Sequence, residues 1–164
     1  MIVLAAAAAL IAIVLLSGTS NRSGTGRQAP QLPTRVLVPP QVTLASLRGK
    51  PAAINFWASW CAPCKEEAPD LERVAGLLRG RARLVGVNWT DGTGGARSYV
   101  EQYHLTFPNL IDSDGVAGNA YGLNGLPTTF ILDSQGKITA VLRGPQSAES
   151  LMRALHLTAN QPDS

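Results

Sequence analysis

Two cysteines stand where a buried-strand pattern ends and a helical pattern begins, and this placement restricts the fold more than any other feature. Cys61 and Cys64 are the only cysteines of the chain and lie within the segment NFWASWCAPCKEE at 55–67. The apolar run at 52–58 has the length and aromatic content of a buried central strand. Apolar residues recur at helical spacing over 62–78, so the cysteine pair opens a helix directly after a strand.

Three chemical interpretations compete for this pair: half of a metal site, a structural disulfide and a redox-active dithiol. A zinc site requires further ligands at suitable spacing, but the only histidines, His104 and His156, stand isolated in helical surroundings. A disulfide across so short a loop would restrict the unfolded chain very little. The sequence therefore favours a redox-active dithiol that needs neither a metal nor a cofactor.

The position at a helix start predicts different roles for the two sulfurs. The i, i+3 spacing brings both sulfurs to one side of the helix, close enough to bond. Unsatisfied backbone N–H groups and the helix dipole stabilise an anion at this end, so we expect Cys61 to be the exposed, attacking thiolate. Cys64 should be the buried resolving thiol, which attacks the mixed disulfide on Cys61 and releases the partner.

The rest of the pattern predicts a single α/β domain with a mixed central sheet. The predicted elements, in chain order, are a short strand within 42–51, a strand at 52–58, a helix at 62–78, a strand at 83–89, a glycine-rich loop at 91–95, a helix at 96–104, a short strand within 107–115, a helix at 116–121, a hairpin over 128–144 and a helix at 147–155. Alternating units that end in a hairpin favour helices on both faces of the sheet. Pro69 should kink the long helix because it removes a backbone donor.

An apolar run at 2–16 precedes the domain. As a helix it would span about 22 Å, which is short of a hydrocarbon core of about 30 Å. We interpret residues 1–18 as a signal peptide or a membrane anchor, and we favour an uncleaved anchor that touches the membrane. Arg22, Arg27 and Arg35 follow the run, and the positive-inside tendency alone would place the following part in the cytoplasm.

Composition divides the remaining chain and argues against a nucleic-acid partner. Residues 19–40 are rich in Gly, Ser, Thr and Pro and are predicted to be a flexible linker, followed by the folded domain at 41–158 and a tail at 159–164. The net charge is +3, but the basic residues are scattered except at 79–83, and no nucleic-acid-binding motif accompanies them. We expect a monomer.

Five segments of the folded part are similar to one known family. NFWASWCAPCKEEAPDL, VGVNW, FPNLIDSDG, AYGLNGLPTTFILDSQGKI and LRG resemble the TlpA/ResA-like branch of the thioredoxin superfamily, over about residues 42–156. The resemblance implies a thioredoxin-like fold and a thiol-disulfide oxidoreductase that acts on protein thiols and disulfides. It also implies that residues 90–104 are the insertion of this branch between a strand and a helix, often tied to partner choice.

The resemblance also assigns residues around the dithiol. Trp60 would shield one side of the dithiol, although plain core packing would also explain a tryptophan there. Pro127 would be a cis proline, and the backbone of the preceding Leu126 would face the disulfide and accept a substrate chain as a short strand.

The resemblance points to Glu67, and not to the position of Asn55, as the acid of the site. Thioredoxins in general carry a buried Asp at the position of Asn55, which cannot titrate, and the ResA-like branch has an active-site glutamate at the spacing of Glu67. A partly desolvated Glu67 with a raised pKa could take the proton from Cys64, three residues earlier on the same helix face. The alternative is a solvated surface glutamate, for which Glu66 is equally eligible.

The residues between the cysteines bear on the direction of electron flow. Pro63 has no N–H to stabilise a thiolate, and Ala62-Pro63 lacks the histidine that strong oxidants carry there, so we favour a reductant outside the cytoplasm. The resemblance suggests apocytochrome c as the client and a membrane electron donor of the CcdA type. An oxidase or isomerase and a redox-switched binding module remain alternatives, whereas a peroxidase is disfavoured because Cys64 is placed as a resolving thiol.

Overall fold

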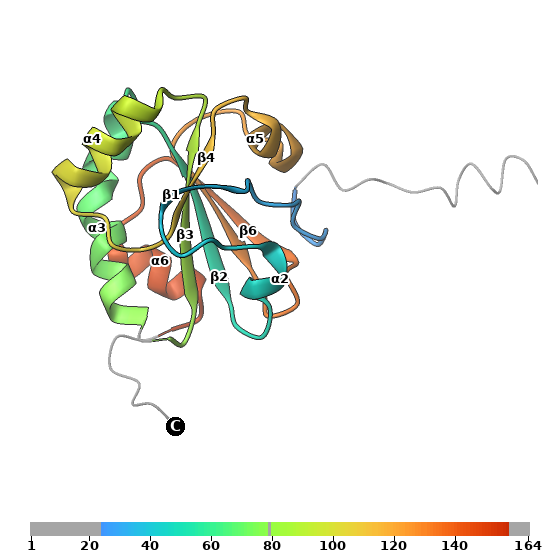
Figure 1. Cartoon of the computed structure of the whole chain (residues 1–164). Coiled ribbons are helices and arrows are strands. Elements are labelled where there is room, and N and C mark those ends of the chain that lie inside the picture. The colour runs from blue at the N-terminus through green and yellow to red at the C-terminus, as the bar shows by residue number, and fades with distance from the viewer. Residues whose placement is uncertain (1–23, 79, 158–164) are drawn as a thin grey trace, which may run out of the picture.

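A six-stranded mixed sheet forms the centre of the molecule (Figure 1). The computed structural model describes residues 24–78 and 80–157, so the predictions for 1–18 and 159–164 lie outside the described residues. The strands are β1 Arg35–Val38, β2 Ala52–Trp57, β3 Arg83–Trp89, β4 Asn109–Asp112, β5 Thr128–Leu132 and β6 Ile138–Arg143. The helices are α2 Leu44–Leu47, α3 Ala62–Leu78, α4 Thr93–Tyr103, α5 Val116–Tyr121 and α6 Ala148–Ala154.

The sheet has the strand order β1-β4-β3-β2-β5-β6. β2 pairs in parallel with β3, and β3 pairs in parallel with β4. The other three pairings, β1 with β4, β2 with β5 and β5 with β6, are antiparallel. The predicted mixed sheet is therefore confirmed, and β2 is one of its two central strands and leads directly to the cysteine pair.

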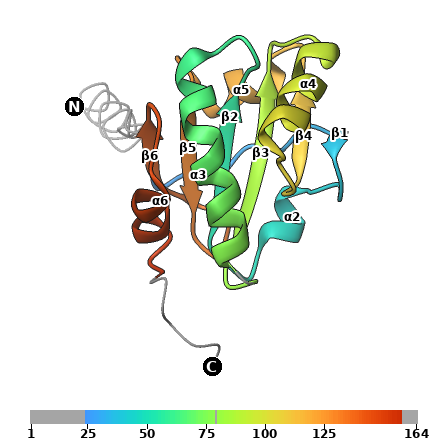
Figure 2. The same ribbon diagram turned by 90° about the vertical axis from the view of Figure 1, so that its left-hand side faces the viewer.

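Helices cover both faces of this sheet, as predicted, and the side chains of β2 alternate between two cores. α3, α4 and α6 lie on one face, and α2 and α5 lie on the other (Figures 1 and 2). Ala53 and Trp57 pack under the first group of helices, whereas Ile54 and Phe56 pack under the second. Full burial of side chains of the size of Ile54 and Phe56 contributes roughly 1.5–3 kcal/mol each, so the cores hold β2 firmly in place.

The predicted linker is wrong for the residues that the structure describes. β1 lies within it and pairs with β4, and Ala29 and Leu32 are buried in the core on the α5 side. Arg27 donates a hydrogen bond to the carbonyl oxygen of Tyr121 at 2.7 Å. Residues 24–40 therefore belong to the folded domain, which begins before residue 41, because apolar residues in a proline-rich segment still find buried sites.

Two further element predictions need correction. Residues 44–47 form the helix α2 rather than a strand, because Thr43 and Ser46 form a reciprocal capping box at its start. α4 begins at Thr93, so part of the predicted glycine-rich loop is helical. The remaining predicted elements are confirmed with small shifts at their ends, including β4 within 107–115 and Pro69 inside α3.

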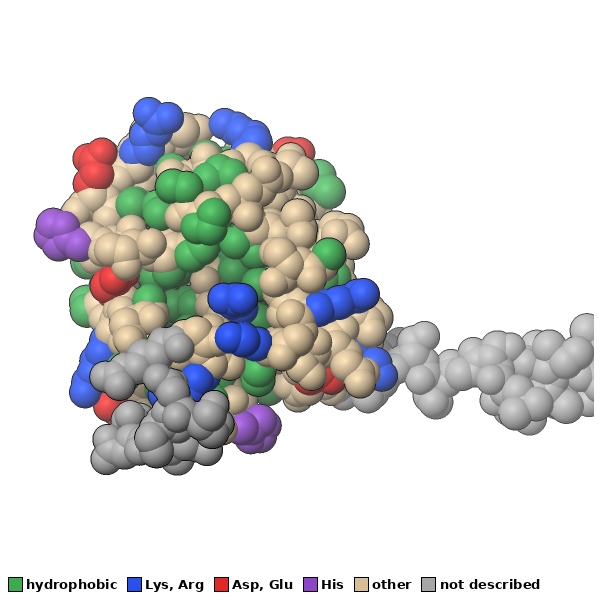
Figure 3. Space-filling view, turned by 60° about the horizontal axis from the view of Figure 1, so that its bottom comes forward, with side chains coloured by type: hydrophobic (Ala, Val, Ile, Leu, Met, Phe, Trp, Pro, Cys, Tyr) green, Lys and Arg blue, Asp and Glu red, His purple; other side chains and the backbone are tan. Residues whose placement is uncertain are grey.

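The basic side chains of the described part are spread over its surface on the face shown in Figure 3. Lys and Arg side chains stand there at several points, with hydrophobic and other neutral atoms between them. No helix within residues 24–78 and 80–157 is both long and apolar enough to span a membrane.

Candidate active site

The two cysteines form a disulfide at the start of α3. The S–S distance is 2.10 Å and the Cα atoms are 5.3 Å apart. Cys61 lies immediately before the helix, and the backbone N–H of Cys64 donates to the Cys61 sulfur at 3.2 Å. The Cys61 sulfur therefore occupies the position of a helix N-cap acceptor, where one of the free N–H groups of the first turn reaches it.

The predicted exposure of Cys61 is wrong, although its position on the accessible side of the pair is right. Only 5% of Cys61 and 1% of Cys64 is exposed. Cys61 lies in a groove of about 360 Å³. The groove is lined by Trp60, Cys61, Ala62, Pro63, Trp89, Asn124, Gly125 and Leu126. Because walls from other loops surround the sulfur, a partner has to enter this groove to reach it.

Two of the three predicted substrate-binding residues, Trp60 and Leu126, line this groove, and Pro127 does not. Trp60 is 58% exposed, so it is not a core residue, and it lines the groove together with Cys61. Leu126 lines it as well, and the Leu126–Pro127 peptide bond is cis, as the resemblance implied. Pro127 itself is buried immediately before β5, and its carbonyl oxygen accepts the N–H of Gly144 at 2.9 Å.

Three residues of the groove were not predicted from the sequence: Trp89, Asn124 and Gly125. Trp89 comes from the end of β3, and Asn124 comes from the loop before β5. Trp89 could have been suspected because β2 and β3 are parallel neighbours, whose carboxyl ends meet at one edge of the sheet. No local pattern marks Asn124.

Glu67 is buried close to Asn55, and the surface interpretation is wrong for it. Glu67 is 2% exposed, whereas Glu66 is exposed. The Asn55 side-chain N–H₂ donates to Glu67 Oε2 at 3.2 Å and to the Thr129 hydroxyl at 2.9 Å. The backbone N–H of Gln146 donates to Glu67 Oε1 at 3.3 Å.

The surroundings of Glu67 change its acidity. Burial raises the pKa of Glu67 to about 7, although the hydrogen bonds from Asn55 and Gln146 oppose the rise, and the charge of Asp70 adds to it. Asn55 Oδ1 is buried and has no hydrogen-bond partner within the part of the chain that the structure describes. The carboxyl group can therefore exchange a proton near neutral pH, as a general base requires.

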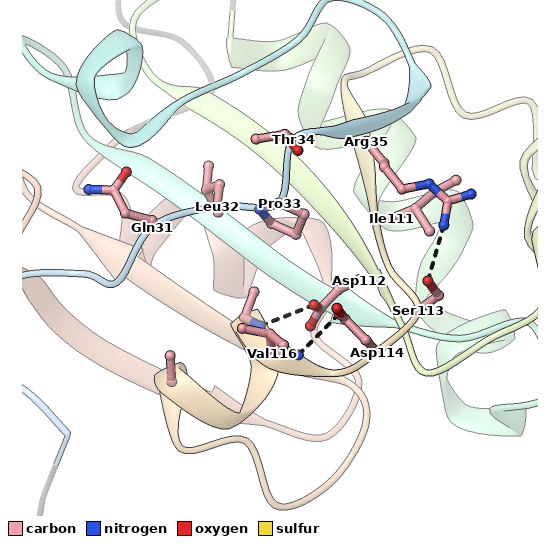
Figure 4. Close-up of a pocket in the computed structure, with 12 residues that line it drawn as sticks. Gln31, Leu32, Pro33, Thr34, Arg35, Ile111, Asp112, Ser113, Asp114 and Val116 are labelled. Carbon is pink, nitrogen blue, oxygen red and sulfur yellow. Dashed lines mark hydrogen bonds between the residues drawn. The ribbon is translucent and has the colours of Figure 1, made fainter.

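A second groove lies away from the dithiol. It has a volume of about 480 Å³ and lies between residues 31–35 and the connection from β4 to α5 (Figure 4). Its Asp112 accepts the backbone N–H groups of Ala117 and Gly118 at 3.0 and 2.8 Å, so this carboxylate stabilises the local fold. No group of three or more His, Cys, Asp or Glu side chains that could hold a metal ion occurs within 24–78 and 80–157.

Comparisons with known proteins identify the relatives of this chain. The model of the AhpC/TSA family matches residues 25–141. Thioredoxin-like protein YneN of Bacillus subtilis is 33% identical over 135 residues, which cover 80% of this chain and 79% of YneN. Thiol-disulfide oxidoreductase ResA of Geobacillus thermodenitrificans is 31% identical over 138 residues, which cover 84% of this chain and 78% of ResA.

A solved structure agrees with these sequence relatives. A secreted disulfide oxidoreductase of Mycobacterium tuberculosis, described as homologous to E. coli DsbE, is 30% identical with a TM-score of 0.68. The match covers 77% of this chain and 95% of that protein. The predicted thioredoxin-like fold and the resemblance to ResA are confirmed. With its Cys61–Cys64 disulfide, the chain belongs to the AhpC/TSA family of thioredoxin-like proteins and is a thiol-disulfide oxidoreductase of the ResA type.

Proposed function

We propose that this oxidoreductase works as a reductant of protein disulfides outside the cytoplasm. The observation that carries the proposal is the weak stabilisation of the attacking sulfur. Among the described residues, the N–H of Cys64 is the hydrogen-bond donor to the Cys61 sulfur, and Pro63 has no N–H to add. A poorly stabilised thiolate makes the reduced form less stable, so the disulfide is favoured and the couple is reducing.

The same site supplies a proton path for the reaction. The Cys61 thiolate attacks a substrate disulfide, forms a mixed disulfide and expels one substrate sulfur as a thiolate. Glu67 then takes the proton of Cys64, and the Cys64 thiolate attacks the Cys61 sulfur and releases the second substrate sulfur. The substrate gains two electrons, and the enzyme ends with the Cys61–Cys64 disulfide. A Glu67 pKa of about 7 suits this role because both of its protonation states are populated near neutral pH.

The groove supports a protein chain as the substrate. Trp60 and Leu126 both line the groove that contains Cys61, and we propose that the Leu126 backbone receives the substrate as a short strand. From the resemblance, we propose apocytochrome c and its C-x-x-C-H haem site as the client. A membrane donor of the CcdA type would reduce the Cys61–Cys64 disulfide again, with residues 1–18 holding a monomeric enzyme at the membrane.

The redox potential of the Cys61–Cys64 couple is the decisive measurement. Equilibration with dithiothreitol or glutathione should give a value near that of thioredoxin, about −270 mV, or lower. A value near that of a strong oxidant, about −120 mV, would instead assign the protein to the formation of disulfides. Catalysed reduction of insulin should be lost in Cys61→Ser, and a protein without any catalytic effect would be a redox-switched binding module.

The client requires a separate measurement. A peptide with an oxidised C-x-x-C-H motif should be reduced faster than the same peptide with its cysteines in another spacing. Equal rates would leave the reductant in place but remove apocytochrome c as the preferred client.

A further inference from the structure

Asp91, which the chemistry above does not use, holds the loop that leads into the dithiol. Asp91 Oδ2 accepts the backbone N–H of Ser59 at 2.7 Å, and Oδ1 accepts the Ser59 hydroxyl at 3.0 Å. The side-chain N–H₂ of Asn88 also donates to Oδ2, at 2.9 Å. Both carboxylate oxygens therefore bind one residue, Ser59, which lies two positions before Cys61.

Ser59 belongs to the turn that connects β2 with α3. The N–H of Cys61 donates to the carbonyl oxygen of Ala58 at 3.2 Å and closes this turn. Trp60, which forms a wall of the groove, is the other central residue of the turn. Since Ser59 is held at its N–H and at its hydroxyl, Asp91 fixes the path of the backbone into both Trp60 and Cys61.

The backbone beside Asp91 is strained. Thr90 has a φ of 45°, in the left-handed region, which a β-branched residue rarely adopts. Its N–H donates to the carbonyl oxygen of Asp112 at 3.0 Å, which ties this conformation to the end of β4. Strain of this kind persists where surrounding contacts demand it and concentrates at functional sites. The strained residue stands between Trp89, in the groove, and Asp91.

Among the glycines at the start of α4, Gly95 is the one at which a side chain would meet neighbouring atoms. A Cβ atom at this position would come within 2.5 Å of the Ser59 hydroxyl oxygen and 3.3 Å of Asp91 Oδ1. Gly94, its neighbour in the same helix turn, has no atom within 4 Å of the corresponding position. The missing side chain of Gly95 therefore leaves the room in which Ser59 and Asp91 meet.

The carboxylate of Asp91 is charged at neutral pH. Partial burial raises its pKa, but the hydrogen bonds from Asn88 and Ser59 outweigh burial and lower the pKa below its ordinary value. Hydrogen bonds to a charged acceptor are about twice as strong as those between neutral groups.

We propose that Asp91 is a positioning residue for the dithiol, which holds Ser59 at two points and thereby stabilises the disulfide relative to the reduced pair. A loosened turn gives the reduced Cys61 additional conformations, and disulfide formation must remove them. Because Asp91 holds the turn, the reduced Cys61 already has fewer conformations to lose when the disulfide forms. This role does not depend on the direction of electron flow, since it acts on the equilibrium between the two redox states.

The equilibrium constant of the Cys61–Cys64 couple with dithiothreitol tests the proposal. Asp91→Ala should shift the equilibrium roughly tenfold towards the dithiol, which is about 30 mV for a two-electron couple. Asp91→Asn should shift it less, because the amide oxygen can still accept the Ser59 N–H and its nitrogen can donate to the Ser59 hydroxyl. Asp114→Ala is the charge-matched control, since Asp114 is exposed and accepts the backbone N–H of Val116, in its own loop, at 3.4 Å.

The relative shifts of the redox equilibrium in these three variants distinguish a positioning role of Asp91 from an effect of its charge. A shift in Asp91→Ala that exceeds those in Asp91→Asn and Asp114→Ala supports positioning. Equal shifts in Asp91→Ala and Asp91→Asn would mean that charge alone acts, and an unchanged equilibrium in Asp91→Ala would leave Asp91 with a purely structural role. Either result overturns the proposal.

A second pair of variants leaves the Asp91 charge in place and decides the matter if Asp91→Ala does not fold. Gly95→Ala pushes the Ser59 hydroxyl away from Asp91 and should shift the equilibrium in the same direction as Asp91→Ala. Gly94→Ala should leave the equilibrium unchanged, because it adds a methyl group in open space. Identical equilibria in the two glycine variants would contradict the proposal.

Discussion

The side-chain amide of Asn55 donates to the carboxylate of Glu67 across 3.2 Å, and both side chains are almost completely buried. Asn55 lies on the face of β2 that α3 covers, together with Ala53 and Trp57, and Glu67 is on the second turn of that helix. Burial raises the pKa of Glu67 to about 7 in spite of this hydrogen bond. The acid of the site therefore titrates near neutral pH, and its partner Asn55 carries no charge.

The first prediction concerns stability and pH. The pKa of Glu67 is about 7 in the folded protein against 4.5 as its ordinary value, so the folded state binds more protons between these pH values. Stability should be highest below this window and fall, by on the order of 3 kcal/mol, as pH rises through it. Urea unfolding of the oxidised protein across the window measures this. Glu67→Gln should remove the decline, whereas Glu66→Gln, which alters an exposed side chain, should keep it.

The second prediction concerns the proton of Cys64. Glu67→Gln preserves the shape of the side chain but removes the base, so the release of a substrate from Cys61 should slow by roughly a hundredfold. The wild-type rate should rise with pH around a pKa of about 7, and the variant should lack this rise. Stopped-flow resolution of a mixed disulfide formed on Cys61 measures both effects. A variant with the wild-type pH profile would remove Glu67 from the mechanism.

The third prediction concerns the link between α4 and the cysteine helix. The Tyr99 hydroxyl donates to the backbone oxygen of Cys64 at 2.5 Å, and its ring stacks on Trp57 with centroids 4.3 Å apart. Tyr99→Phe keeps the stacking and loses the hydrogen bond, which should cost about 1 kcal/mol of unfolding free energy. Chemical denaturation measures this cost. Tyr103→Phe on the same helix is the control, and an equal loss there would show that the bond to Cys64 contributes nothing of its own.

The fourth prediction concerns Trp89, which lines the groove. A Cβ atom on Gly118 in α5 would lie 2.3 Å from Trp89 Nε1, so Gly118→Ala must displace the indole. We expect a loss of about 1–3 kcal/mol in stability and a raised KM for peptide substrates. Gly76→Ala in α3 meets no atom within 4 Å and should stabilise the protein by about 0.5–1 kcal/mol through helix propensity. An unchanged KM in Gly118→Ala would show that Trp89 takes no part in binding.

The long elements around the dithiol could be predicted from the sequence because their patterns are strong and local. The strand at 52–57 is a continuous buried run, and the helix at 62–78 has its apolar residues on one face. β1 could not be predicted in this way. It has four residues in a proline-rich segment, and its partner β4 lies about 70 residues further along the chain, so only the complete sheet defines it. α2 was mistaken for a strand because its helical signal is a capping box between Thr43 and Ser46, with no periodicity behind it.

The residues of the active site fall into the same two groups, those placed together by their spacing in the sequence and those brought together only by the fold. Cys61, Cys64 and Glu67 share one helix start, so their spacing in the sequence already places them together. The groove around Cys61 also includes Trp89 and Asn124, which are far away in the chain and are brought to it only by the folded sheet. Asp91 is equally remote from Ser59 in sequence, and their contact follows from the parallel pairing of β2 with β3.

The carboxylate of Glu67 is held from two distant parts of the chain, by Asn55 on β2 and by the N–H of Gln146 after β6. The cysteine helix is consequently not a portable module. A graft of residues 61–67 onto a foreign helix would carry both sulfurs and the glutamate, but it would leave behind the burial and the donors that set the acid. The graft would still form disulfides, whereas its proton transfers would depend on the buffer.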